Sequence, residues 1–418
     1  MVDALKSVFK VEELRRKIIF TLMMILVFRI GVHIPVPGIK LEVIQELIGQ
    51  GQLLGFFDII SGGAFANFSI FAMSITPYIN ASIIIQLLTI VVPSLERLAK
   101  EGVEGRKKIV EYTRYLTVIL GFVQGIGISF GLRTALENTS FPSILLIALT
   151  LTAGTAFLMW LGEMITEKGI GNGISLIIFA GIVSGLPGGV MSMVEYFKTG
   201  TIGIITLLAF VIVACVVIVA IIAVNEGQRR IPVHYAKRIV GRKVYGGQST
   251  HIPIKVNSAG VIPVIFAMSI MMFPGTIASW FPNNSFARAI GSFFDFTSIP
   301  YMVFYAMLIM FFTYFYSAIT FNPADVSENI KKNGGFIPGI RPGRPTTEYI
   351  TKIMNRITLA GAIFLAAIAV LPSILIALTA IPVYFGGTAL LIVVGVALDT
   401  MKQLEASLLM RHYEGFMK

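Results

Sequence analysis

The chain has 418 residues, of which 56% are hydrophobic and only 13% are charged, and its formal net charge is +11. A soluble domain carries about 25% charged residues, so this chain has about half the charge that a water-covered surface needs. The composition therefore excludes a soluble enzyme and a disordered chain, and it indicates that most of the exterior faces lipid. A single cysteine, Cys215, also excludes an intrachain disulfide framework.

The N-terminus is basic and partly apolar. Its first 17 residues hold five Lys and Arg residues, with apolar residues between them at near-helical spacing. No small-residue cleavage site follows in the next apolar stretch, so a cleaved signal peptide is not expected. Residues 1–17 are predicted to form a short amphipathic helix that lies on the membrane surface.

Ten segments are long and apolar enough to cross a bilayer, which takes about 20 mainly apolar residues. They are 18–34, 71–92, 112–132, 143–165, 174–195, 203–224, 259–280, 301–320, 357–375 and 382–398. The first is interrupted by Arg29 and His33, and the last two are separated by Pro372 and Pro382. The pattern predicts an all-α polytopic membrane protein with ten transmembrane helices.

The apolar, Gly-rich segment 53–69 between the first two spans is too short to cross the membrane. Non-helical backbone at membrane depth must be buried in protein or line a cavity. The residues by themselves fit a small plug and a packed structural loop equally well.

Positive charge is distributed unevenly over the loops. With ten spans and both termini in the cytoplasm, 28 of the 33 Lys and Arg residues lie on the cytoplasmic side and four on the external side. Cytoplasmic loops of membrane proteins are enriched in Lys and Arg. This split predicts that both termini are cytoplasmic.

Two cytoplasmic loops, 225–258 and 321–356, are long, basic and rich in turn residues. The first alternates β-formers with turn residues and predicts a hairpin-like finger, with Gly246 and Gly247 near its bend. The charges fit two readings: they set the topology only, or they form a docking surface for an acidic or nucleic-acid-rich partner.

No sequence pattern for chemistry is present. There is no P-loop, no Ser-His-Asp pattern and no HExxH, so no enzyme activity, cofactor or metal is expected. The glycines of 169–175 follow a predicted membrane helix rather than a strand, and they predict a tight turn.

The second, fifth, sixth, seventh and tenth spans have no acidic or basic residue in their middle thirds, and polar residues such as Asn80, Gln86 and Ser269 are neutral. Ion-coupled transporters usually place acidic or histidine residues near the midplane. An uncharged, aliphatic path can instead close to water and ions by dewetting.

Several segments together resemble the SecY family, whose members are the central subunits of the bacterial protein-translocation channel. They are SGGAFANFSIFAMSITPYINASIIIQLL, EGRKKIVEYTRYLT, GIGNGISLIIFAGIVSGLP, YAKRIVGRKVYGGQSTHIPIKVNSAGVIPVIFA, FIPGIRPGRPT and FGGTALLIVV. They occur in the family's order and spacing from about Lys17 to Ser407, which is nearly the whole chain.

The resemblance implies two pseudo-symmetric five-helix halves, 18–198 and 199–398, with a cytoplasmic tail at 399–418. It implies a plug at 55–69, with a short re-entrant helix and the residues Gly62, Gly63, Ala64, Phe65 and Asn67. It also implies a central constriction ring of aliphatic side chains, assigned to Ile79, Ile83, Ile174, Ile178, Ile265 and Ile392.

The resemblance further implies a lateral gate between the second and seventh spans, flanked by the third and eighth. Candidate polar residues across that gate are Ser82, Gln86, Gln124 and Ser269. In the two basic loops it points to Arg242, Lys243 and Arg341 as contacts for a SecA-type ATPase motor or for ribosomal RNA.

The function implied is a passive protein-conducting channel in the bacterial cytoplasmic membrane. It would pass unfolded preproteins across the membrane and release signal sequences sideways into lipid, driven by the ribosome or the motor. Implied partners are SecE- and SecG-like small membrane subunits. The rival readings are a secondary transporter, which the missing midplane carboxylates disfavour, and a membrane-embedded enzyme, which has no catalytic constellation.

Overall fold

The computed structural model describes the chain except for eleven short segments. These are residues 1–10, 51–57, 59–60, 201–202, 236–237, 241–242, 246–248, 280–283, 296–297, 380–386 and 417–418. The predicted surface helix at 1–17 falls mostly outside the described residues. Its last part, from Glu12, already belongs to the first long helix.

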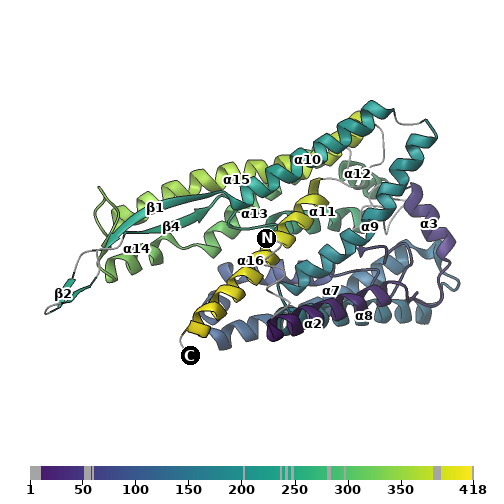
Figure 1. Ribbon diagram of the computed structural model, residues 1–418. Helices are drawn as coiled ribbons and strands as arrows, with labels where there is room; N and C mark the ends of the chain where they lie inside the picture. The colour runs from purple at the N-terminus through teal and green to yellow at the C-terminus, as the bar shows by residue number, and fades with distance from the viewer. Residues whose placement is uncertain are drawn as a thin grey trace.

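A long helix lies at each of the ten predicted spans (Figure 1). They are α2 (Glu12–Val32), α5 (Thr76–Val91), α7 (Val103–Gly131), α8 (Phe141–Lys168), α9 (Gly173–Lys198), α10 (Ile204–Glu226), α11 (Ile262–Ser279), α13 (Ile299–Thr320), α15 (Arg344–Thr379) and α16 (Gly387–Phe416). The largest differences are at the end of the chain. α15 begins 13 residues before the predicted span, and α16 continues through most of the predicted tail.

Length and composition alone single out fewer helices. Among the described residues, six helical stretches are long and apolar enough to cross a membrane, and a seventh is the pair α5 and α6, bent by 99°. α2, α11 and α16 do not meet that criterion although they lie at predicted spans. In α2 the reason is charge, because Arg15, Arg16, Lys17 and Arg29 interrupt the apolar run.

The loops contain four further helices that the hydropathy pattern did not reveal. They are α3 (Leu41–Gln50), α6 (Pro93–Lys100), α12 (Ser285–Phe293) and α14 (Pro323–Lys332). All four are short and amphipathic, with 8 to 10 residues. A window tuned to spans of about 20 residues passes over helices of this length.

The long helices from α2 to α9 contact those from α10 to α16 at several places. α9 contacts α10 and α16, and α11 contacts α5 and α7. The turn between α8 and α9 is fastened to α2, because the Ile170 N–H donates to Thr21 Oγ1 at 3.1 Å. The predicted tight turn at 169–175 is therefore a junction where three helices pack.

The predicted finger is present and is built as a two-stage hairpin. β1 (Gln228–Tyr235) pairs antiparallel with β4 (Ser249–Lys255), and beyond them β2 (Arg238–Val240) pairs with β3 (Lys243–Tyr245). The last pair joins Val240 and Lys243, so the chain reverses between these two residues. Gly246 and Gly247, which were expected near the bend, come later in the chain and lie outside the described residues. Figure 1 shows this finger projecting from one end of the bundle, while α3 and α12 lie at the other.

The second basic loop joins the finger instead of forming a separate element. Its short strand β5 (Gly335–Phe336) pairs with β1, opposite His234 and Tyr235, and makes a three-stranded sheet in the order β4-β1-β5. An apolar cluster beneath the sheet is contributed by both loops and α15. Its buried members are Ile231, Val233, Ile254, Ile330, Ile337 and Ile350. We call this unit the loop domain.

Truncating the centre of this cluster should loosen the loop domain. Ile350 on α15 is fully buried, and an Ile→Ala change at such a site costs about 2–5 kcal/mol. Ile350→Ala should therefore speed amide hydrogen exchange in β1 and β4. Arg344→Ala, six residues earlier on the same helix with a side chain 91% exposed, should leave exchange unchanged. Equal exchange in both variants would show that the cluster does not hold the sheet.

Candidate functional site

The isoleucines assigned to the constriction ring lie in one apolar cluster. Five of them are buried members of it, and Ile174 is half-buried and packs against it. The five are Ile79, Ile83, Ile178, Ile265 and Ile392. They come from α5, α9, α11 and α16, so both sets of helices contribute. The cluster is large and also includes many ordinary helix-packing residues.

The described part of the predicted plug is a chain of tight turns. Asp58 and Ser61 are helical, and residues 62–75 follow as successive turns. The loop bonds to itself: the Gly63 N–H donates to the Asp58 carbonyl at 2.9 Å, and the Phe65 N–H donates to Ser61 Oγ at 3.1 Å. Such internal bonds let non-helical backbone exist where water is scarce.

Asp58 organises this loop with its side chain. Its carboxylate Oδ1 accepts the Ala66 N–H at 2.7 Å, which links two residues that are eight positions apart. Burial raises the pKa of the Asp58 carboxyl, and the hydrogen bonds from the Ala66 and Phe65 backbone oppose that rise only in part. A negative charge on Asp58 therefore costs free energy because it is buried, whereas its oxygen stabilises the loop by accepting the Ala66 N–H.

The plug segment is packed on two sides. Ala64 is fully buried and belongs to the same apolar cluster as the ring isoleucines. Phe65 and Phe68 belong to a second cluster with Ile44 of α3 and Leu151 of α8. Asn67 is half-buried. Among the described residues of the plug segment, the small Ala64 belongs to the central cluster, whereas Phe65 and Phe68 pack in the second cluster.

Gly62 places the plug against α9. A Cβ atom at Gly62 would lie 2.7 Å from the Cα of Gly181, and its φ of +70° is unfavourable for other residues. The Gly62 carbonyl accepts a 2.8 Å hydrogen bond from Arg29 Nη1 of α2. Gly63 also has a positive φ, of +85°, and open space around it. A glycine at 62 is thus required by close approach, and one at 63 by backbone conformation alone.

The four candidate gate residues lie on the expected helices. Ser269 of α11 and Gln124 of α7 are buried, and Ser82 and Gln86 of α5 are half-buried. α11 packs against α5, α7 and α13. Among the described contacts, the hydrogen bond that joins two of the four runs within α5, from Gln86 Nε2 to Ser82 Oγ at 3.3 Å.

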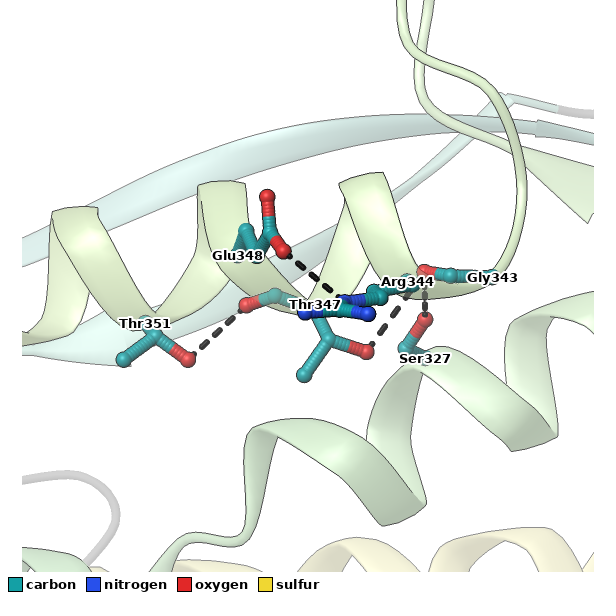
Figure 2. Close-up of polar contacts among 6 residues, drawn as sticks. All are labelled: Ser327, Gly343, Arg344, Thr347, Glu348 and Thr351. Atoms are coloured by element: carbon teal, nitrogen blue, oxygen red, sulfur yellow. Dashed lines mark hydrogen bonds and ion pairs between the residues drawn. The ribbon is translucent and has the colours of Figure 1, made fainter.

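Arg341 lies on an exposed turn of the loop domain whose backbone is held in place. Thr346 Oγ1 donates to the Arg341 carbonyl at 2.8 Å, and Ser327 Oγ of α14 donates to the Gly343 carbonyl at 2.9 Å. Figure 2 shows Gly343 bonded to Ser327 and Thr347 at the start of α15. Arg341 is exposed and lines a shallow hollow of about 550 Å³ together with Lys331 and Phe336.

The other two predicted docking residues are only partly described. Arg242 lies outside the described residues, and Lys243 is described only as the first residue of β3. Sequence reasoning missed two functional candidates, Arg29 and Ser184, and treated Arg29 only as an interruption of the first span. A charge in the middle of an apolar span was the available signal, because such residues are rarely without a role.

Comparison with known proteins places these features in one family. The SecY family model matches residues 69–401. The protein translocase subunit SecY of Halalkalibacterium halodurans is 51% identical over 434 residues, with all of both chains covered.

Solved structures share the fold. A SecY structure, described as one whose plug domain stabilises the closed state of the translocation channel and maintains a membrane seal, matches with a TM-score of 0.67 at 19% identity; 94% of this chain and 92% of that one are covered. Sec61 in the canine ribosome-channel complex from the endoplasmic reticulum matches with a TM-score of 0.60 at 17% identity, with the same coverage.

Two substitutions at Asp58 should separate its charge from its hydrogen bond. Asp58→Asn keeps an acceptor for the Ala66 N–H and removes the cost of burying charge, so amide exchange in 62–66 should stay slow or become slower. Asp58→Ala leaves that N–H unpaired, which costs about 1–3 kcal/mol, so exchange there should accelerate at least about fivefold. Hydrogen exchange measured by mass spectrometry checks both. Fast exchange in the Asp58→Asn variant would refute the assignment of Asp58 as a hydrogen-bond acceptor that stabilises the loop.

Proposed function

We propose that the apolar cluster at the centre of this chain is the closed seal of a channel, because the chain belongs to the SecY family of protein translocase subunits. The chain is a protein-conducting channel subunit and not an enzyme. The observation that carries the proposal is that Ala64 and isoleucines from four helices belong to one apolar cluster. A seal of this kind excludes water and hydrated ions without binding any particular side chain.

The ring proposed within this cluster is formed by Ile79, Ile83, Ile174, Ile178, Ile265 and Ile392. Ile79 and Ile83 are four residues apart on α5, as are Ile174 and Ile178 on α9, so each pair faces one direction. The five-helix halves are proposed as 18–198 and 199–398, separated at the α9–α10 connection. Opening them would widen the ring for an unfolded polypeptide.

The lateral gate is proposed along the contact of α11 with α5. A signal helix of about 20 apolar residues gains free energy on entering hydrocarbon, whereas a polar stretch does not. The neutral side chains Ser82, Gln86, Gln124 and Ser269 would let the seam close without a buried charge. The packing of α11 against both α5 and α7 supports this placement.

The loop domain is proposed as the docking surface for the partner that supplies energy. Relatives of this fold occur in ribosome-channel complexes, and ribosomal RNA is a polyanion that suits Arg341, Arg242 and Lys243. A SecA-type ATPase is the proposed alternative occupant. SecE- and SecG-like subunits would complete the complex in the bacterial cytoplasmic membrane, with both termini and the loop domain in the cytoplasm.

Reconstitution tests the function directly. Liposomes holding the purified chain with SecE- and SecG-like subunits should protect a presecretory substrate from external protease, but only when a SecA-type motor and ATP are added. Absence of protection with an active motor would contradict the channel assignment.

Reversing the charge at Arg341 should disable docking. Arg341→Glu should lower motor- or ribosome-driven transport at least about tenfold, because like charges then face the partner. Arg344→Glu is the matched control, since Arg344 is also exposed, lies three residues away and is paired with Glu348 on its own helix. Transport in proteoliposomes is the measurement, with membrane abundance as a check on folding. Equal transport in both variants would refute the docking role.

Polar substitution in the ring should break the seal. Ile83→Asn and Ile392→Asn should raise ion conductance at rest and let substrates with defective signal sequences pass, because an amide allows water to wet the constriction. Ile84→Asn is the control, since its side chain is 39% exposed on another face of α5. Single-channel conductance in planar bilayers measures the effect, and unchanged conductance in the ring variants would count against the ring.

A further inference from the structure

Arg29 is a charged residue within an otherwise apolar part of α2, and the channel function described above gives it no task. A guanidinium at membrane depth is costly unless it is bonded within the protein. Arg29 is half-buried, and its Nη1 donates to the Gly62 carbonyl and to Ser184 Oγ, both at 2.8 Å. One nitrogen thus joins a spanning helix, the plug segment and α9.

Ser184 is oriented for this role by a second bond. Its hydroxyl donates to the Gly181 carbonyl at 2.6 Å, so its oxygen lone pairs are free to face the guanidinium. Gly181 is also the residue that Gly62 approaches so closely that no side chain fits between them. The plug backbone therefore rests on a bare patch of α9, directly beside the bonded Arg29.

We propose that Arg29 is the positioning residue that holds the plug in its closed place, by bonding the Gly62 carbonyl while Ser184 holds the guanidinium in register. The proposal rests on the proposed channel function. The acceptor of the bond from Arg29 is a backbone carbonyl, so the bond does not depend on a side chain of the plug. Hydrogen bonds from a charged donor are about twice as strong as neutral ones, and a low-dielectric site strengthens them further.

The geometry also explains why opening remains reversible. α2 and α9 contact each other, so Arg29 and Ser184 can stay bonded when the plug leaves. Among the contacts of the described residues, the bond from Arg29 to Gly62 is the one that must break, and the guanidinium keeps Ser184 as a partner while the plug is away. The same charge lies in the last turn of α2, where the helix dipole favours it. Arg29 is thereby stable in both positions of the plug.

The experiment measures plug position in the whole complex without relying on transport. Cys215 is the single native cysteine, so Cys215→Ser with Ala64→Cys places one thiol on the buried plug residue that reaches the central cluster. A membrane-impermeant maleimide added from the external side should label this thiol slowly at rest. Adding Arg29→Gln should speed labelling at least about tenfold and raise resting ion conductance. Arg29→Lys should give a smaller increase, and Ser184→Ala should act in the same direction.

Arg16→Gln is the matched control, because Arg16 lies on the same helix, is exposed and pairs with Glu12. It should label like the parent. Labelling of the Arg29→Gln and Ser184→Ala variants at the parent rate would overturn the proposal that Arg29 holds the plug in its closed place. If Arg29→Gln fails to accumulate, Ser184→Ala and Arg29→Lys decide the matter. Motor-driven transport of a normal substrate by the parent complex is measured separately. Failure of the proposed role of Arg29 and failure of the proposed channel function therefore give different results.

Discussion

The structure depends on a rule that lipid imposes: every backbone polar group and every charge at membrane depth must find its partner inside the protein. The long helices satisfy it by their own hydrogen bonds. The run of turns at 62–75 satisfies it partly within itself, through Asp58 and Ser61, and partly through bonds to Ile34, Val36 and Arg29. Irregular backbone can therefore lie next to the central apolar cluster without bringing water into it.

The same requirement for internal partners applies where the plug segment lies against the central apolar cluster. The proposed seal is apolar and does not select a sequence, whereas the plug segment also makes directional polar contacts at its edge. Ala64 makes the apolar contact, and Gly62 with Arg29 makes the polar one. Apolar packing alone is tolerant of sliding, so a hydrogen bond from a fixed helix gives the plug a defined place.

The loop domain shows how distant basic segments become one surface. β5 pairs with β1, and isoleucines from both loops and α15 form one apolar cluster. The exposed charges of both loops therefore lie on one packed unit. The support reaches the bundle directly, because β1 follows α10 and β4 leads to α11. Lys402 of α16 also pairs with Glu226 at the end of α10, at 2.8 Å, so the base of the finger is fastened to a helix that carries Ile392.

The sequence by itself determined the ten spanning helices, the finger and the family, because a run of apolar residues, alternating β-formers and long motifs are all local signals. It also singled out isoleucines on α5, α9, α11 and α16, whose role as a ring stays a prediction. It did not reveal α3, α6, α12 and α14, whose amphipathic turns are too short for a span window. Only the tertiary structure decided that the two basic loops share one sheet, that Ala64 belongs to the same apolar cluster as the central isoleucines, and that Arg29 reaches Gly62 and Ser184. Those contacts join residues 33 and 155 positions apart, and no local pattern encodes a partner so distant.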